Sequence, residues 1–161
     1  MSGRTVCAAL VSGVLAGGAV RSGQNVKVPY PEEYRGWFHV KSMVIVSDAH
    51  PLFGSFGGMH HVYVNPIGRK VLAAGGPYAD GTIFAFDLLE AKDEAGAYVE
   101  GARKFVGVMM KHSTHFASTG GWGFETFEGD SRSQRLVKDP KRECYGCHQP
   151  QRDGVFSKFR K

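Results

Sequence analysis

Residues 82–91 read TIFAFDLLEA and lie near the middle of the chain. They follow the turn signal DGT at 80–82, and their β-branched and aromatic residues are typical of a strand. Successive residues of a strand point to opposite faces, so Phe84 and Phe86 are expected on the same face. The stretch therefore predicts a strand that presents two phenylalanines to one side of a sheet.

Four more stretches carry strand signals, and they are 38–47, 59–65, 103–113 and 121–129. A short helix is predicted between the second and third strands, because Asn65 can cap it, Pro66 suits its first position and Gly75 can end it. Three other segments are predicted as a turn or short helix (30–37), a loop (48–58) and a partly helical stretch broken near Pro140 (132–148). The chain thus reads as a β-rich body with one inserted helix and a distinct C-terminal segment.

The C-terminal segment contains RECYGCHQPQ at 142–151. Cys144, Cys147 and His148 form a C-x-x-C-H motif, which is read as a c-type haem attachment site. Each thiol can form a thioether with one haem vinyl group, and the histidine that follows can bind the iron as proximal ligand. The motif therefore predicts one covalently attached haem c.

The motif has three alternative interpretations. A zinc site needs four ligands, usually from two such pairs, and the chain has only one other cysteine, Cys7. A thioredoxin-like pair belongs at the start of a helix in an alternating strand–helix chain, whereas this pair lies close to the C-terminal end of the sequence. A chance match is the third reading.

The first residues resemble a secretory signal peptide. Arg4 precedes an apolar run from about Thr5 to Val20, which is too short and too rich in small residues for a membrane-spanning helix. Cleavage after Ala19 would remove Cys7 and leave no membrane anchor. The alternative is a buried N-terminal helix. The expected organisation is a signal peptide at 1–19 and a single haem-binding domain at 20–161, located in the periplasm.

The charge balance gives no sign of a nucleic-acid partner. The chain of 161 residues has 20 Lys and Arg against 15 Asp and Glu, a formal charge of +5, and the basic residues are scattered rather than gathered in a stripe. Removal of the signal peptide would lower this excess by one charge. No structural disulfide is expected, because the two remaining cysteines belong to the haem motif.

Together these motifs resemble those of cytochrome P-460 and the cytochromes c′-β. The matching pieces are YRGW (34–37), VYVNP (62–66), YADGT (78–82), GWGF (121–124) and, most specifically, ECYGCHQPQRDGVFSKF (143–159). The resemblance implies an α+β fold, mainly an antiparallel β-sheet with a short helix and a C-terminal haem-attachment helix. It also implies a homodimer and a five-coordinate iron with His148 as proximal ligand.

The family divides by a lysine that is bonded to the haem ring. Hydroxylamine-oxidising cytochromes P-460 carry this bond, whereas the cytochromes c′-β lack it, cap the iron with phenylalanines and bind nitric oxide. Alignment of the short helix places Ala73 or Ala74 at the lysine position, and Lys70 lies one helical turn earlier. Lys70 is therefore either a shifted cross-link or a solvated surface residue, and the resemblance favours a cytochrome c′-β.

Several side chains are candidates for the distal side of the haem. Phe84 and Phe86, with Phe56 or Phe53 from the preceding loop, could form an apolar cap, although core packing is the simpler role of each one. Met109 and Met110 could supply a thioether ligand, although one of them must face the core anyway. His60–His61 and His112/His115 could bind a metal, but adjacent strand residues face opposite ways, so His60 and His61 cannot both point inward.

An acid near the iron would matter for catalysis. Glu125 shares a predicted strand face with Gly123 and Phe127, and a carboxylate there could act as a general base. In the hydroxylamine-oxidising members the corresponding acid aligns with Gly123, so Glu125 could equally be an exposed strand carboxylate. The leading expectation is an exported cytochrome that binds nitric oxide or similar nitrogen-oxide ligands. A hydroxylamine-oxidising enzyme and a periplasmic electron-transfer cytochrome with a redox partner are the alternatives.

Overall fold

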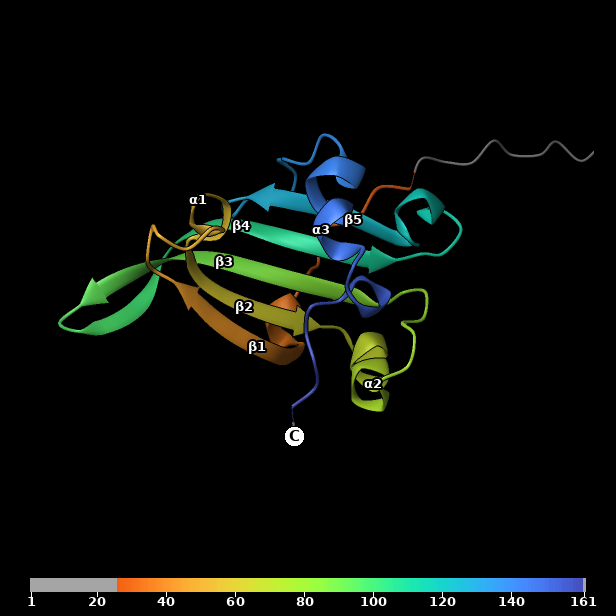
Figure 1. Ribbon diagram of the computed structural model, residues 1–161, viewed down its shortest axis with the longest axis horizontal. Coiled ribbons are helices and arrows are strands. Elements are labelled where there is room, and N and C mark those ends of the chain that lie inside the picture. Colours follow the sequence, from red (N-terminus) through yellow and green to blue (C-terminus); the bar gives the residue numbers. More distant parts are fainter. Residues whose placement is uncertain (1–25, 161) are drawn as a thin grey trace, which may run out of the picture.

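A computed structural model describes residues 26–160. One antiparallel sheet dominates it, and its strands follow one another in space in the order of the sequence (Figure 1). The strands are β1 (Phe38–Ile45), β2 (Gly58–Val64), β3 (Ile83–Glu94), β4 (Ala97–Lys111) and β5 (Trp122–Glu128). All five predicted strands and the mainly antiparallel α+β class are confirmed. The predicted signal peptide at 1–19, with Cys7, lies outside the described residues.

The helices are short. They are α1 (Phe53–Phe56), α2 (Pro66–Ala74) and α3 (Gly146–His148), with the π-helical turn η3 (Lys141–Tyr145) before α3 and the 3-10 turns η1 (Tyr34–Gly36), η2 (Ala117–Thr119) and η4 (Arg152–Gly154). Helix α2 begins and ends as predicted, because the Asn65 side chain accepts a hydrogen bond from the Gly68 N–H at 3.0 Å and Gly75 adopts a left-handed φ of 71°. Among the described residues, none of the helices combines the length and the apolar character needed to cross a bilayer.

Two segments differ from the sequence-based expectation. The predicted loop at 48–58 contains the single helical turn α1. Strand β3 continues past residue 91 to Glu94, and β4 begins at Ala97, before residue 103. A two-residue turn joins them, in which Ala95 and Gly96 have φ of 54° and 86°. Positive φ at both positions suits a twisted hairpin. The hairpin was not predicted because residues 92–94 of β3 are all charged and residues 97–102 of β4 lack the apolar alternation of a half-buried strand.

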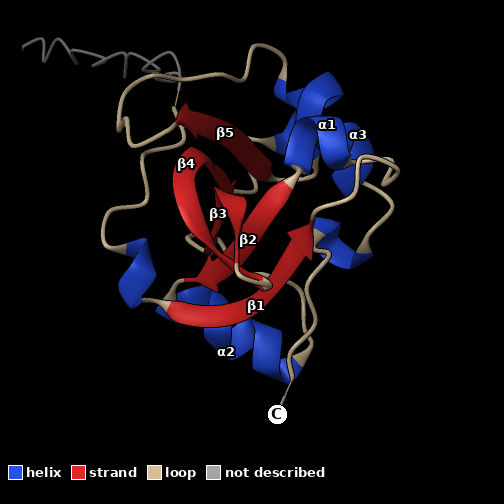
Figure 2. Cartoon of the chain, turned by 90° about the vertical axis from the view of Figure 1, so that its left-hand side faces the viewer, coloured by secondary structure: helices blue, strands red, loops and turns tan. Residues whose placement is uncertain are grey.

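The two faces of the sheet are covered by different parts of the chain. One face, which we call the N-terminal face, packs against the segment before β1, and its buried residues are Val28, Tyr34, Ala85, Val106, Val108 and Phe127. The other, which we call the α3 face, includes Val62, Val64, Leu72, Phe84, Trp122 and Phe124, and the segment around α3 packs on it. Helices α1 and α3 lie on the same side of the sheet (Figure 2).

Candidate functional site

The haem-attachment motif lies on one short helical segment, as predicted, and this segment begins after Pro140. Asp139 caps its start by accepting hydrogen bonds from the N–H groups of Lys141 and Arg142, at 3.1 and 3.2 Å. Within it, Cys147 and His148 follow Cys144 by three and four residues, the spacing of neighbouring side chains on a helix surface. The local fold therefore places both thiols and the imidazole within about one turn of helix.

The imidazole of His148 is held in one tautomer. Its Nδ1 lies 2.7 Å from the carbonyl oxygen of Gly154, and because a carbonyl only accepts, Nδ1 must carry the proton. Nε2 is then the unprotonated nitrogen, the form in which an imidazole binds a metal. Burial lowers the pKa of His148, although the bond to Gly154 opposes this, so the ring is neutral at physiological pH. The ring packs between Phe124 and Phe156, with centroid distances of 5.0 and 4.9 Å.

The two thiols differ in environment. Cys144 is half-buried against the α3 face, whereas Cys147 is exposed, and both are free. Burial raises the pKa of Cys144 to about 11, with smaller contributions from the carboxylates of Glu143 and Glu125. Both cysteines are therefore available for covalent attachment, and Cys144 stays a protonated thiol at neutral pH.

The surface around His148 is suited to a flat apolar group. Phe156, which touches the imidazole, is 50% exposed, and Phe56 on the same side of the sheet is 36% exposed. An exposed aromatic side chain against a metal-binding group is characteristic of a ligand-binding surface. A haem held by Cys144, Cys147 and Nε2 of His148 fits this donor set and this surface.

A cluster of aromatic rings lies on the same side of the sheet. Phe56 of α1, Phe86 of β3 and Phe105 of β4 are mutually in contact, with centroid distances of 5.8–6.2 Å. Phe56 and Phe86 were predicted as partners, whereas Phe105 was missed. Its position on the predicted strand 103–113 could have identified it, because every second residue of a strand lies on the same face and Phe105 therefore shares a face with Gly107 and Met109. We call these three residues the phenylalanine cluster.

Phe84 belongs to a different group of residues. It shares the α3 face with Phe86, as predicted, but it is only 5% exposed and contacts Tyr78 and Trp122 at centroid distances of 5.3 and 6.2 Å. The structure therefore brings Phe56 together with Phe86 and places Phe84 within a packed core. Phe53, the other loop candidate, is on α1 and is 36% exposed.

The predicted opposite orientation of His60 and His61 is confirmed. His60 is buried on the α3 face against Phe86, and its Nε2 is bonded to the carbonyl oxygen of Phe56, which ties α1 to the sheet. His61 lies on the N-terminal face and pairs with Glu100. The rings of His112 and His115 are in edge-to-face contact, with their centroids 4.1 Å apart. Between residues 26 and 160, no three His, Cys, Asp or Glu side chains form a metal-binding group.

Glu125 and Lys70 are not brought together with His148. Glu125 lies on the N-terminal face of β5, where its carboxylate accepts a hydrogen bond from Arg135 at 2.8 Å. Gly123 faces the same way, because a side chain there would meet Val28 and Phe116. Lys70 is exposed on α2, about 200° around the helix from the buried Leu72. Ala73 and Ala74, at the aligned lysine position, are exposed as well.

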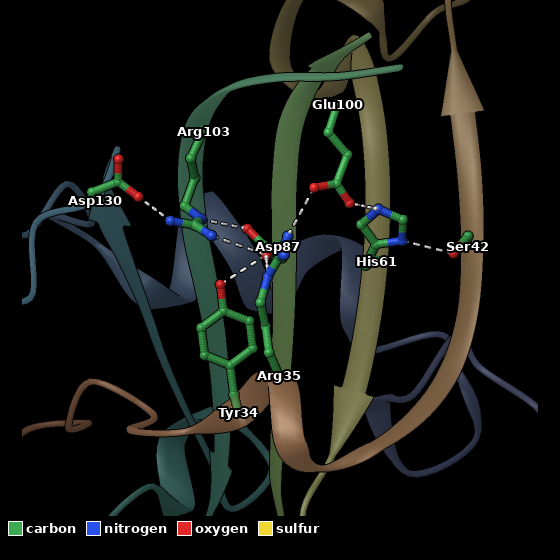
Figure 3. Close-up of polar contacts among 8 residues, drawn as sticks. All are labelled: Tyr34, Arg35, Ser42, His61, Asp87, Glu100, Arg103 and Asp130. Carbon is green, nitrogen blue, oxygen red and sulfur yellow. Dashed lines mark hydrogen bonds and ion pairs between the residues drawn. The ribbon is translucent and has the colours of Figure 1, made fainter. Parts of the chain in front are cut away.

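The N-terminal face carries a buried charge with a complete set of partners (Figure 3). The carboxylate of Asp87, which is 0% exposed, accepts hydrogen bonds from the Tyr34 hydroxyl at 2.8 Å and from the guanidinium groups of Arg35 and Arg103 at 2.9 and 2.7 Å. Arg103 also pairs with Asp130. Sequence analysis did not single out Asp87, although a lone acid in an apolar strand is a usable signal, because burial of a carboxylate requires partners.

The comparison with protein families agrees with this site. The Cytochrome P460 family matches residues 31–157, most of the chain. The chain therefore belongs to the cytochrome P460 family, whose members bind haem. Among curated proteins, none matches the chain.

Proposed function

We propose that the protein is a c-type cytochrome that carries one covalently attached haem and binds nitric oxide or a similar small nitrogen ligand. The observation that carries this proposal is His148, whose Nδ1 is committed to the Gly154 carbonyl while Nε2 is left for a metal. The haem would supply an iron that binds diatomic ligands. Cys144 and Cys147 would hold it through two thioether bonds, and His148 would be its proximal ligand.

The phenylalanine cluster supports a ligand-binding role. Phe56, Phe86 and Phe105 offer only apolar surface, and His60 beside them has its Nε2 engaged by the Phe56 carbonyl. An apolar distal side disfavours water and charged ligands and admits small neutral ones, because a charge taken out of water needs a partner. An iron held by His148 with an apolar opposite side would be suited to nitric oxide.

Hydroxylamine oxidation is the second candidate, and it requires a base to accept protons. Glu125 is paired with Arg135 on the other face of the sheet, and Lys70 projects into solvent. These positions favour ligand binding over turnover. Electron transfer alone is the third candidate, and it would gain support from a protein side chain as sixth iron ligand.

Export and dimerisation are part of the same proposal. Covalent attachment of haem to C-x-x-C-H motifs takes place outside the cytoplasm, so the signal-like residues 1–19 and the motif at 144–148 agree with a periplasmic protein. A homodimer and an external redox partner are proposed on the family resemblance.

One preparation tests the proposal. The full chain is expressed with a haem-maturation system, and acid-acetone extraction is compared with Cys144→Ser/Cys147→Ser. We expect the haem to stay on the wild-type polypeptide and to be extracted from the double variant.

Intact mass should show loss of about the first nineteen residues. A typical haem c spectrum that changes with nitric oxide, with little hydroxylamine turnover, is expected. Extraction of haem from the wild type, or steady turnover with Lys70 bonded to haem, would contradict the proposal.

A further inference from the structure

The carbonyl that fixes His148 belongs to an unusual turn. In η4 (Arg152–Gly154), Asp153 has φ 47° and ψ 35° and Gly154 has φ 71°, so two consecutive residues are left-handed. This conformation is strained at a residue with a side chain, although aspartate tolerates it better than most residues. The surrounding contacts must therefore hold the turn in this form.

Those contacts converge on Asp153. Its carboxylate accepts hydrogen bonds from the ammonium group of Lys111 at 2.8 Å and from the backbone N–H of Tyr78 at 2.6 Å. Its backbone carbonyl accepts a hydrogen bond from the indole of Trp122 at 2.9 Å. Each partner comes from outside the C-terminal segment, so the turn is attached to the sheet and to the loop before β3.

The ion pair is shielded from water. The side chain of Lys111 is only 11% exposed and that of Asp153 23%, and the ammonium group lies 4.8 Å from the centre of the Trp122 ring. Trp122 in turn is 1% exposed and lies against Gly154, where a side chain would meet the indole at 3.2 Å. A shielded pair of this kind depends on both partners, because removal of one leaves an uncompensated charge.

The geometry points to Asp153 as a positioning residue that, through the Gly154 carbonyl, orients His148 and sets the strength of its bond to iron; this inference rests on the proposed haem attachment. A histidine whose Nδ1–H donates to a carbonyl is a more basic ligand, and a more basic ligand favours ferric over ferrous iron. Loss of the Asp153 contacts would loosen the turn, weaken this hydrogen bond and raise the reduction potential.

The test compares Asp153→Ala, Asp153→Asn and Lys111→Met with the wild-type holoprotein. Asparagine keeps the tolerance for the left-handed conformation and removes the charge. When the solution is held at the wild-type midpoint potential, the ratio of reduced to oxidised haem in Asp153→Ala should be at least about three. This ratio corresponds to a rise of about 28 mV in the midpoint potential for a one-electron couple. The other two variants should shift in the same direction by less. The iron–histidine stretching band of the ferrous protein should move to lower frequency in parallel.

Asp80→Asn is the matched control. Asp80 also accepts a backbone hydrogen bond, from Ser113 at 2.8 Å, but its polar partners are Ser113 and His112 rather than residues of the η4 turn. Its potential and stretching band should stay at the wild-type values. Unchanged potentials and bands in all three test variants, with haem covalently bound, would overturn the inference while leaving the proposed function intact. Extraction of haem from the wild type by acid-acetone would instead remove the proposed function and this inference with it.

Discussion

The two faces of the sheet are built from the same strands but differ in what surrounds their key side chains. On β3, alternation sends Asp87 to the N-terminal face and Phe86 to the α3 face. Asp87 accepts hydrogen bonds from three side chains of the same chain, so its buried charge is balanced without a ligand. On the α3 face, Phe156 is 50% exposed against His148, whose Nε2 is free of the proton, and Phe56 on the same side is 36% exposed. The difference supports a structural role for the buried charge of the N-terminal face and agrees with the proposal of a haem on the α3 face.

The comparison predicts a large loss of stability when the buried charge of the N-terminal face loses its carboxylate. Replacement of Asp87 by alanine would leave two arginines without their shared carboxylate. We expect Asp87→Ala to lower the free energy of unfolding by about 3–5 kcal/mol, a large part of the ~5–15 kcal/mol typical of a domain. Urea unfolding of the holoprotein measures this. Nitric oxide binding by the folded protein should be unchanged.

Glu100→Gln is the control for this experiment. Glu100 belongs to the same polar network through His61 and Arg35, but its side chain is 44% exposed. Water replaces its interactions, so the expected loss is below about 1 kcal/mol. Similar losses in the two variants would show that burial of Asp87 does not decide the stability of this face.

A smaller effect separates two phenylalanines of the α3 face. Phe84→Ala should lower the free energy of unfolding by about 3–5 kcal/mol, because its ring fills a packed core. Phe56→Ala should cost less, because the ring is 36% exposed. Cyanide should bind ferric iron faster in Phe56→Ala and at the wild-type rate in Phe84→Ala. Faster cyanide binding in Phe84→Ala alone would show that Phe84, and not Phe56, controls ligand access to the iron.

The sequence predicts the sheet better than it predicts the site. Alternation and turn residues locate all five strands, and Asn65 and Gly75 locate α2, because these signals are local. The partners of Asp87 are not local, since Arg35 is 52 residues away, so no pattern along the chain connects them. The role of Gly154 is hidden for another reason. A backbone carbonyl is present at every residue, and only the fold shows which one meets His148.

The smallest expected effect is a dependence of stability on acid that comes from the N-terminal face. Burial raises the pKa of Asp87, but hydrogen bonds from Arg103, Tyr34 and Arg35 outweigh it, so the pKa lies below its usual value of 3.8. The unfolded chain therefore binds this proton more readily than the folded one. The stability that Asp87 contributes is complete above the unfolded pKa and is lost as the pH falls through the folded pKa.

This dependence can be measured against Asp87→Asn, which has no proton to bind at this position. The difference in the free energy of unfolding between the wild type and Asp87→Asn should be constant from about pH 7 to 5 and should shrink below that, by at most about 1.4 kcal/mol per pH unit for one proton. Urea unfolding at each pH, followed by circular dichroism of the holoprotein, gives the difference. A difference that stays constant down to pH 3 would mean that Asp87 has the same pKa in both states. The contribution of the N-terminal face would then come from packing rather than from its buried carboxylate.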